Sequence, residues 1–175
     1  MSKNKKKLFL FFFIEFILLL ALDQITKYLA ILHLKGANSI ELIKGALELH
    51  YLENRGAAFG VLQNQKIFIL FVGIIFLILL TFCLIKLPDH KKYNCLYYIA
   101  GAMVAGAIGN MIDRIRFDFV VDFIYFSLID FPIFNVADIY ITLSIIILAI
   151  IVLFVYKEED FAFLSFKQKK YRELK

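Results

Sequence analysis

The chain has 175 residues, of which 62% are hydrophobic, and its formal net charge is +5. This apolar share is higher than that of typical soluble domains and indicates an integral membrane protein. The length fits one domain, so we expect a single membrane domain over residues 1–175.

Four apolar segments are long enough to cross a bilayer as α-helices, which takes about 20 residues each. We expect these spans near residues 8–32, 67–85, 96–112 and 139–156. The segments 33–66 and 113–138 then lie on one side of the membrane, and the segments 1–7, 86–95 and 157–175 lie on the other. The predicted fold class is therefore an α-helical integral membrane protein with four transmembrane helices.

The first span begins like a signal peptide, with a basic stretch followed by an apolar run. No small-residue cleavage site follows, and the helix continues into Asp23 and Lys27, so we expect an uncleaved span. These two residues are four apart, and a helix places them on one face, where they can form an ion pair. Glu15 lies inside the apolar run, and the sequence offers no account of it.

Lys and Arg are distributed unevenly between the two sides of this arrangement. The side that holds both termini carries 13 of them, and the side with the two longer segments carries 6. Because cytoplasmic segments are enriched in Lys and Arg, we expect both termini in the cytoplasm. We interpret the basic tail after Tyr156 as an anchor that touches anionic membrane lipid, and we expect no nucleic-acid partner.

The first outward segment alternates apolar and polar residues on either side of Lys44 and Gly45. This alternation predicts a small extracytoplasmic β-hairpin. A hairpin alone is marginal in water, so we expect it to lie on the helix ends or on the membrane surface. The three histidines, His33, His50 and His90, are widely separated and argue against a zinc site.

The second outward segment contains the most informative pair of residues, Asp122 and Asp138. Its many aromatic and branched residues predict a loop in the membrane interface. A carboxylate at a bilayer boundary is costly unless it is paired, hydrated or used. Two neighbouring carboxylates can share a proton and a water, as a carboxylate-pair hydrolase requires. The structural alternative is that Asn135 caps the fourth helix and Asp138 occupies its first turn.

Other polar residues lie at the same outer level. Asn54 and Gly56 open a stretch of small residues that permits close backbone approach, and Asn110 lies near the end of the third span. We expect the adjacent Asp113 and Arg114 to form a structural ion pair. The third span also carries small residues at spacings of three and four, which predict close helix packing: Gly101, Ala102, Ala105, Gly106 and Gly109.

The residues by themselves leave three functions open. A protease would use Asp122 and Asp138 as its acid and base. A proton-coupled carrier would use Glu15, Asp23 and Asp113 as a relay, although the chain shows no inverted repeat. A non-enzymatic adaptor would dock a partner on the hairpin edge.

Five short motifs in chain order resemble those of lipoprotein signal peptidase, or signal peptidase II, a family of bacterial membrane aspartyl proteases. The resemblance covers almost the whole chain. The matching segments are Asp23–Lys27, Asn54–Gly60, Gly109–Arg114, Val121–Phe123 and Phe134–Asp138. The sequence shows no departure from the family's pattern at these positions.

The resemblance implies an aspartic endopeptidase of the bacterial cytoplasmic (inner) membrane. Such an enzyme cuts a diacylglyceryl-modified prolipoprotein just before its lipidated cysteine, and it is inhibited by globomycin. The resemblance assigns the catalytic dyad to Asp122 and Asp138. It places substrate-binding or supporting roles on Asp23, Lys27, Asn54, Gly56, Asn110, Asp113, Arg114 and Asn135.

The resemblance also gives the outward segments a shape, because they resemble a cradle and a lid over the site. The dyad chemistry requires no metal ion and no cofactor. The expected partners are lipid-modified prolipoproteins and membrane lipid, and we expect the enzyme to be a monomer.

Overall fold

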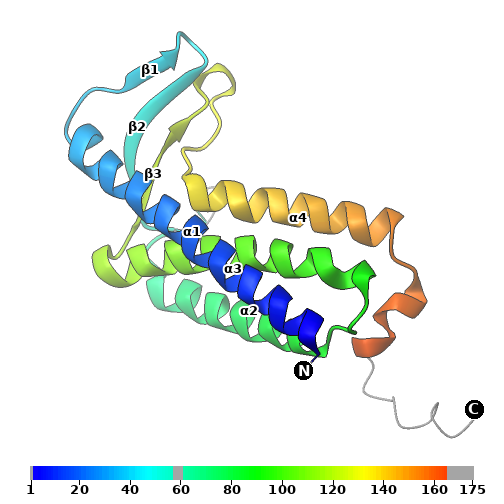
Figure 1. Cartoon of the computed structure of the whole chain (residues 1–175). Coiled ribbons are helices and arrows are strands. Elements are labelled where there is room, and N and C mark those ends of the chain that lie inside the picture. Colours follow the sequence, from blue (N-terminus) through cyan, green and yellow to red (C-terminus); the bar gives the residue numbers. More distant parts are fainter. Residues whose placement is uncertain (1, 57–60, 165–175) are drawn as a thin grey trace, which may run out of the picture.

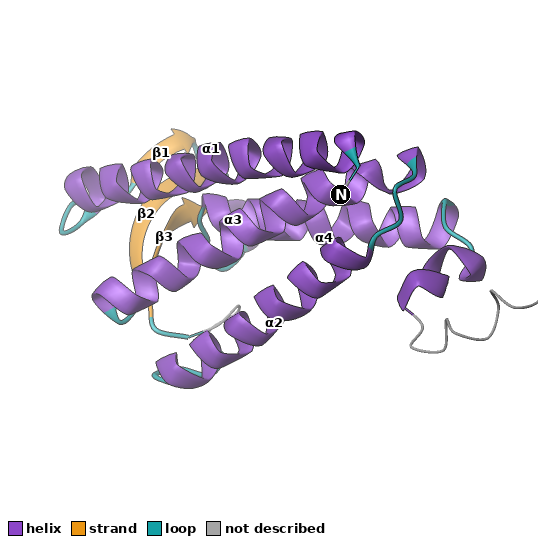
Figure 2. Cartoon of the chain, turned by 60° about the horizontal axis from the view of Figure 1, so that its bottom comes forward, coloured by secondary structure: helices purple, strands orange, loops and turns teal. Residues whose placement is uncertain are grey.

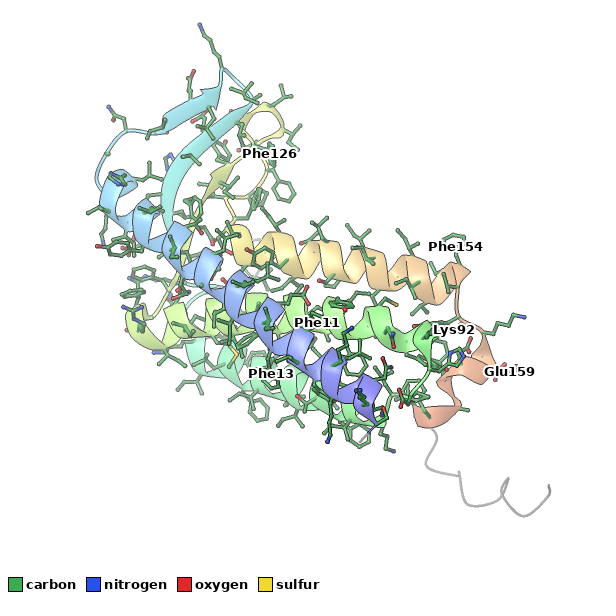
Figure 3. All side chains as sticks on the ribbon, viewed as in Figure 1. Phe11, Phe13, Lys92, Phe126, Phe154 and Glu159 are labelled. Atoms are coloured by element: carbon green, nitrogen blue, oxygen red, sulfur yellow. The ribbon has the colours of Figure 1, made fainter. Side chains whose placement is uncertain are left out.

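The computed structural model describes residues 2–56 and 61–164. Four long helices form most of the fold (Figure 1). They are α1 (Lys3–Leu34), α2 (Lys66–Lys86), α3 (Asn94–Phe117) and α4 (Val136–Phe154). All four belong to segments long and apolar enough to cross a membrane, which confirms the predicted fold class. Most of their outward-facing side chains are apolar, and Phe11, Phe13 and Phe154 are examples (Figure 3).

Helix α3 continues past the expected end of its span at Ile112 and reaches Phe117. The sequence predicted Asp113 and Arg114 in the outward segment that follows this span. Both side chains are buried, so the helix carries them into the protein and not into water. Asp118 caps the end of the helix, and its backbone takes the left-handed conformation (φ 68°) that aspartate tolerates better than most residues.

Helix α3 is the central element, and it lies between α1 and α2 (Figure 2). The small residues on α3 permit this close packing, as predicted. A Cβ atom on Gly106 would lie 2.6 Å from the carbonyl oxygen of Ala137 in α4. Where α3 packs on α1, a Cβ atom on Gly101 would lie 2.8 Å from the Glu15 carboxylate. A side chain at Gly106 would therefore push α3 and α4 apart, whereas one at Gly101 would displace the Glu15 side chain.

The predicted hairpin is present and gains a third strand. Strands β1 (Ile40–Ile43), β2 (Leu47–Asn54) and β3 (Val120–Tyr125) form an antiparallel sheet in the order β1-β2-β3. The expectation of an interfacial loop over 113–138 was wrong for β3, because Val121 and Phe123 are buried against Ala30 and Leu34 of α1. The hydrophobic contact with α1 therefore holds the sheet on the helix ends.

Short 3-10 helices complete the described chain. Helix η2 (Lys91–Tyr93) precedes α3, η3 (Ser127–Ile129) follows β3, and η4 (Glu158–Leu164) follows α4. An ion pair of 2.5 Å joins Lys92 to Asp160 and holds η4 against η2. Helix η3 lies at the opposite end of the molecule, beside the sheet (Figure 1).

Candidate active site

The structure brings Asp122 and Asp138 to one cavity of about 590 Å³, which we call the dyad cavity. Asp122 lies in the middle of β3 and is only 1% exposed. Asp138 lies in the first turn of α4. Both side chains line the cavity together with Asn54, Asn110 and Arg114. Residues that are far apart in the sequence thus form one polar group.

Amide groups donate to all four oxygens of the two carboxylates. Asp122 accepts from the side-chain amides of Asn135 (2.6 Å) and Asn54 (2.9 Å), one at each oxygen. Asp138 accepts from the Asn110 side chain (2.9 Å) and from the Asn135 backbone N–H (3.1 Å). Each carboxylate is therefore held in a fixed orientation by neutral donors.

Asn135 caps α4, as the sequence predicted. Its side-chain oxygen accepts from the Asp138 backbone N–H (3.0 Å), and the Asp138 side chain accepts from the Asn135 backbone N–H. This reciprocal arrangement is a capping box. The structural alternative for Asp138 is therefore present, but it occupies one carboxylate oxygen only. The other oxygen bonds to Asn110 at the wall of the dyad cavity.

A buried lysine lies behind the dyad. Lys27 is 2% exposed, and its ammonium contacts Asp23 (3.0 Å), Asp113 (3.1 Å) and the side-chain oxygen of Asn110 (2.8 Å). These three partners match the three N–H donors of the ammonium group. The predicted ion pair between Asp23 and Lys27 is confirmed.

The predicted ion pair between Asp113 and Arg114 was wrong. Asp113 pairs with Lys27, and the Arg114 guanidinium donates to the backbone oxygens of Gly56 (2.6 Å) and Asn110 (3.2 Å). Successive residues on a helix project in different directions, so adjacent charges do not face each other.

The two acids beside Lys27 hold the residues that precede the dyad. Asp23 accepts a hydrogen bond of 3.1 Å from the backbone N–H of Ala137, and Asp113 accepts one of 3.1 Å from that of Val121. One central ammonium thus connects, through two carboxylates, to the backbone just before Asp138 and just before Asp122. The cluster fixes α4 and β3 relative to each other.

Gly56 shows why a small residue is needed beside Asn54. A Cβ atom at Gly56 would lie 2.6 Å from the backbone oxygen of Val61. Its N–H donates to the Asn54 side chain (2.9 Å), which helps to orient the amide that bonds Asp122. Residues 57–60 of the same motif lie outside the described residues.

Burial and charge raise the pKa of Asp122. Burial, followed by the neighbouring charge of Asp138, raises the pKa of Asp122 to about 7. Hydrogen bonds from Asn54 and Asn135 oppose this shift without cancelling it. Asp122 can therefore retain a proton near neutral pH.

All ten residues predicted for the site contribute to this network, and one contributor was missed. Gln24 donates to Asp23 (3.1 Å), Asp113 (3.1 Å) and the Gly109 backbone oxygen (3.3 Å). Its position inside the first motif was the available signal. Within residues 2–56 and 61–164, no group of three or more His, Cys, Asp or Glu side chains is arranged to hold a metal ion.

The fold and the site together define a multi-pass membrane protein with a buried carboxylate pair. Comparison with known families is consistent with that class, since the sequence model described as signal peptidase (SPase) II matches residues 15–154. The chain belongs to the signal peptidase II family and is thus a peptidase. This assignment confirms the resemblance seen in the motifs and favours the enzyme over the carrier and the adaptor.

Individual relatives agree with this assignment. The chain is 46% identical over 134 residues to a lipoprotein signal peptidase of Caldanaerobacter subterraneus subsp. tengcongensis, which covers 76% of this chain and 89% of that protein. It is 38% identical over 158 residues to a lipoprotein signal peptidase of Streptococcus pyogenes serotype M5. This match covers 90% of this chain and 98% of that protein.

Solved structures show the same fold. A bacterial membrane enzyme structure obtained by the in meso method at 2.3 Å matches with a TM-score of 0.73 and 32% identity over 94% of both chains. A second such structure, at 1.9 Å, matches with a TM-score of 0.71 and 33% identity, over 83% of this chain and 94% of the other.

Proposed function

We propose that the chain removes signal peptides from diacylglyceryl-modified prolipoproteins and that Asp122 and Asp138 are its catalytic dyad. Membership of the signal peptidase II family supports the substrate class. The assignment of the catalytic pair is supported by one observation. Asp122 and Asp138 share a cavity in which amide donors orient all four carboxylate oxygens.

The chemistry requires one protonated and one ionised carboxyl group. Burial and the Asp138 charge raise the pKa of Asp122, so Asp122 is the member that holds the proton and donates it to the scissile carbonyl oxygen. Asp138 takes a proton from a water molecule, which attacks the carbonyl carbon. As the tetrahedral intermediate collapses, the C–N bond breaks and Asp138 gives the proton that it took from water to the nitrogen of the leaving cysteine. Asp122 recovers its proton from a hydroxyl of the intermediate.

Arg114 supplies positive charge beside the reaction. Its guanidinium is fixed by two backbone carbonyl oxygens and lines the dyad cavity. A fixed cation stabilises negative charge that develops on the substrate during attack, because the site need not reorganise around it. No step of this mechanism uses a metal ion or a cofactor.

The rest of the dyad cavity suits a lipid-anchored substrate. Beyond the dyad, its wall follows α4 through Ile141, Leu143 and Ile145 and includes the apolar segment 131–134. Acyl chains favour the bilayer by about 0.8 kcal/mol per buried methylene. A site that opens onto apolar helix surface therefore meets the lipidated cysteine without extracting its acyl chains from the membrane.

The proposal extends to location. The chain resides in the bacterial cytoplasmic membrane as a monomer, with both termini in the cytoplasm and the sheet and dyad on the outer side. A membrane-impermeant thiol reagent tests this in intact spheroplasts after Cys83 and Cys95 are replaced by Ser. Lys44→Cys in the hairpin turn should react, and Lys91→Cys should react only after lysis. The opposite pattern would contradict the orientation.

The substrate class is tested with purified protein in detergent. The substrate is a diacylglyceryl-modified prolipoprotein, and its unmodified precursor is the control. Mass spectrometry should show one cut, immediately before the modified cysteine, in the lipidated form only. Equal cleavage of both precursors would contradict the lipid requirement. Absence of cleavage by folded protein would contradict the function.

A further inference from the structure

A second hollow lies beside the dyad cavity, on the side of the sheet and η3. It has a volume of about 310 Å³, and we call it the outer hollow. Its polar lining is His50 of β2, Tyr125 of β3 and Asp130 at the end of η3. The mechanism above uses none of these three side chains.

The two hollows share one wall. Phe131, Pro132 and Ile133 line both the dyad cavity and the outer hollow. The wall is a single segment of backbone with its side chains. A peptide bound in the dyad cavity therefore needs only a short extension to cross the wall and enter the outer hollow.

Hydrogen bonds at both ends hold this wall in place. Its distal end is fixed by Phe134, which exchanges two backbone hydrogen bonds with Ile124 (2.8 and 3.0 Å). At the other end, the backbone N–H of Phe131 donates to Phe126 (3.2 Å), whose side chain is labelled in Figure 3. The outer hollow is thus already formed in the free protein, which lowers the cost of ordering it on binding.

The outer hollow carries negative charge. The Tyr125 hydroxyl donates to Asp130 at 2.7 Å, and Glu48 pairs with Tyr125 across the sheet. The hydrogen bond to Asp130 raises the pKa of Tyr125, and the charges of Asp130 and Glu48 contribute to the same shift. Asp130 is exposed, so its carboxylate is accessible to a ligand.

The path of the substrate connects the two hollows. The signal peptide lies on the apolar side of the scissile bond, where the dyad cavity follows α4. The chain after the cysteine must leave the bilayer, because it leads to the mature protein in water. The outer hollow lies across the wall, and its polar lining comes from β2, β3 and the end of η3.

We propose that the outer hollow is a subsite for the first residues after the lipidated cysteine and that it favours a cationic side chain there. The inference rests on the proposed function. An extended peptide advances about 3.3 Å per residue, so the second or third residue beyond the scissile bond reaches across the wall. The Asp130 carboxylate then attracts a Lys or Arg side chain and repels Glu or Asp.

The test uses three diacylglyceryl lipopeptides that are identical through the cysteine and carry Lys, Gln or Glu two residues after it. Their kcat/KM values are measured with the wild type, Asp130→Asn and Asp118→Asn. Asp118 is the control, because it is also an exposed aspartate with left-handed backbone (φ 68°, against 47° at Asp130). It pairs with Lys66 and lines neither hollow. Asn tolerates that conformation, so both variants should fold.

The wild type should cleave the Lys peptide with a kcat/KM about fivefold higher than the Glu peptide. This is the effect expected when Asp130 forms an exposed ion pair with Lys and repels Glu. The preference should shrink to less than about twofold in Asp130→Asn and persist in Asp118→Asn. It should also weaken at high salt. Equal rates for the three peptides in the wild type, or equal loss of the preference in both variants, would overturn the subsite.

Failure of the proposed function would look different, because none of the three peptides would be cleaved by any folded variant. That result would overturn the subsite together with the function. Cleavage of all three peptides without a charge preference would overturn the subsite alone.

Discussion

The side-chain amide of Asn135 donates a hydrogen bond of 2.6 Å to Asp122, while the same residue caps the helix that carries Asp138. One residue therefore fixes both members of the dyad. The side-chain bond orients the carboxylate on β3, and the cap orients the first turn of α4. These two roles can be separated by substitution.

Asn135→Ser should separate them, because Ser caps helices as well as Asn does but is too short to reach Asp122. Asn135→Ala should lower stability by about 1 kcal/mol and reduce kcat. Asn135→Ser should regain the melting temperature without regaining kcat. The measurement is kcat on a lipopeptide beside thermal unfolding in detergent. Full activity in Asn135→Ser would show that the bond to Asp122 is dispensable.

Removing the charge of Lys27 should destabilise the protein strongly. Lys27→Met leaves Asp23 and Asp113 buried without their cation, which costs about 3–5 kcal/mol. Lys35→Met removes an exposed ion pair with Glu53, which water and salt already weaken, and should change stability far less. Chemical denaturation in detergent compares the two variants. Equal, small effects would contradict the account of the buried cluster.

Two glycines should respond differently to an added methyl group. Gly106→Ala brings a Cβ against the backbone oxygen of Ala137 and the Ile141 side chain, and it should cost about 1–3 kcal/mol. Gly73→Ala meets only the flexible side chain of Met111 at 3.1 Å and should be tolerated. Melting temperatures provide the comparison. A destabilised Gly73→Ala beside a neutral Gly106→Ala would contradict the packing described.

Activity should depend on the proton held by Asp122. Since its pKa is raised to about 7, kcat/KM should fall as the pH rises through about 7, when Asp122 loses the proton that polarises the carbonyl. A pH–rate profile of kcat/KM from pH 5 to 9 measures this descending limb. A flat profile across that range would contradict the assignment of the proton to Asp122.

Stability should show the same titration with a defined sign. The folded pKa of Asp122 lies above the ordinary value of 3.8, so the folded state binds the proton more tightly. The contribution of this group to stability is greatest below about pH 4 and is lost as the pH rises to about 7. The melting temperature of Asp122→Asn relative to the wild type should therefore increase between pH 5 and 8. A constant difference would contradict the shifted pKa.

Local sequence patterns predicted the helices and the hairpin, because apolar length and alternation are local properties. Strand β3 was missed because Val120–Phe123 is buried on both faces and shows no alternation. Its assignment depends on pairing with β2 and packing on α1, which are long-range contacts. The same long-range pairing brings Asp122 into the dyad cavity.

The candidate site residues came largely from the family resemblance. Among their contacts, the sequence predicted the ion pair between Asp23 and Lys27 and the Asn135 cap but not the rest of the network. The sequence suggested a bond between Asp113 and Arg114 because they are adjacent. In the structure, Asp113 instead reaches Lys27 on another helix. The bridging role of Gln24 also depends on how α1 packs on α3, which no local pattern encodes.

The most direct test of the central claim is the initial cleavage rate of a diacylglyceryl lipopeptide by Asp122→Asn and Asp138→Asn. Asp118→Asn is the matched control, and thermal unfolding confirms that each variant is folded. The account predicts that each dyad variant loses about 10²–10⁴-fold or more in rate, whereas Asp118→Asn cleaves like the wild type. Near-native cleavage by either folded dyad variant would contradict the assignment of Asp122 and Asp138 as the catalytic pair.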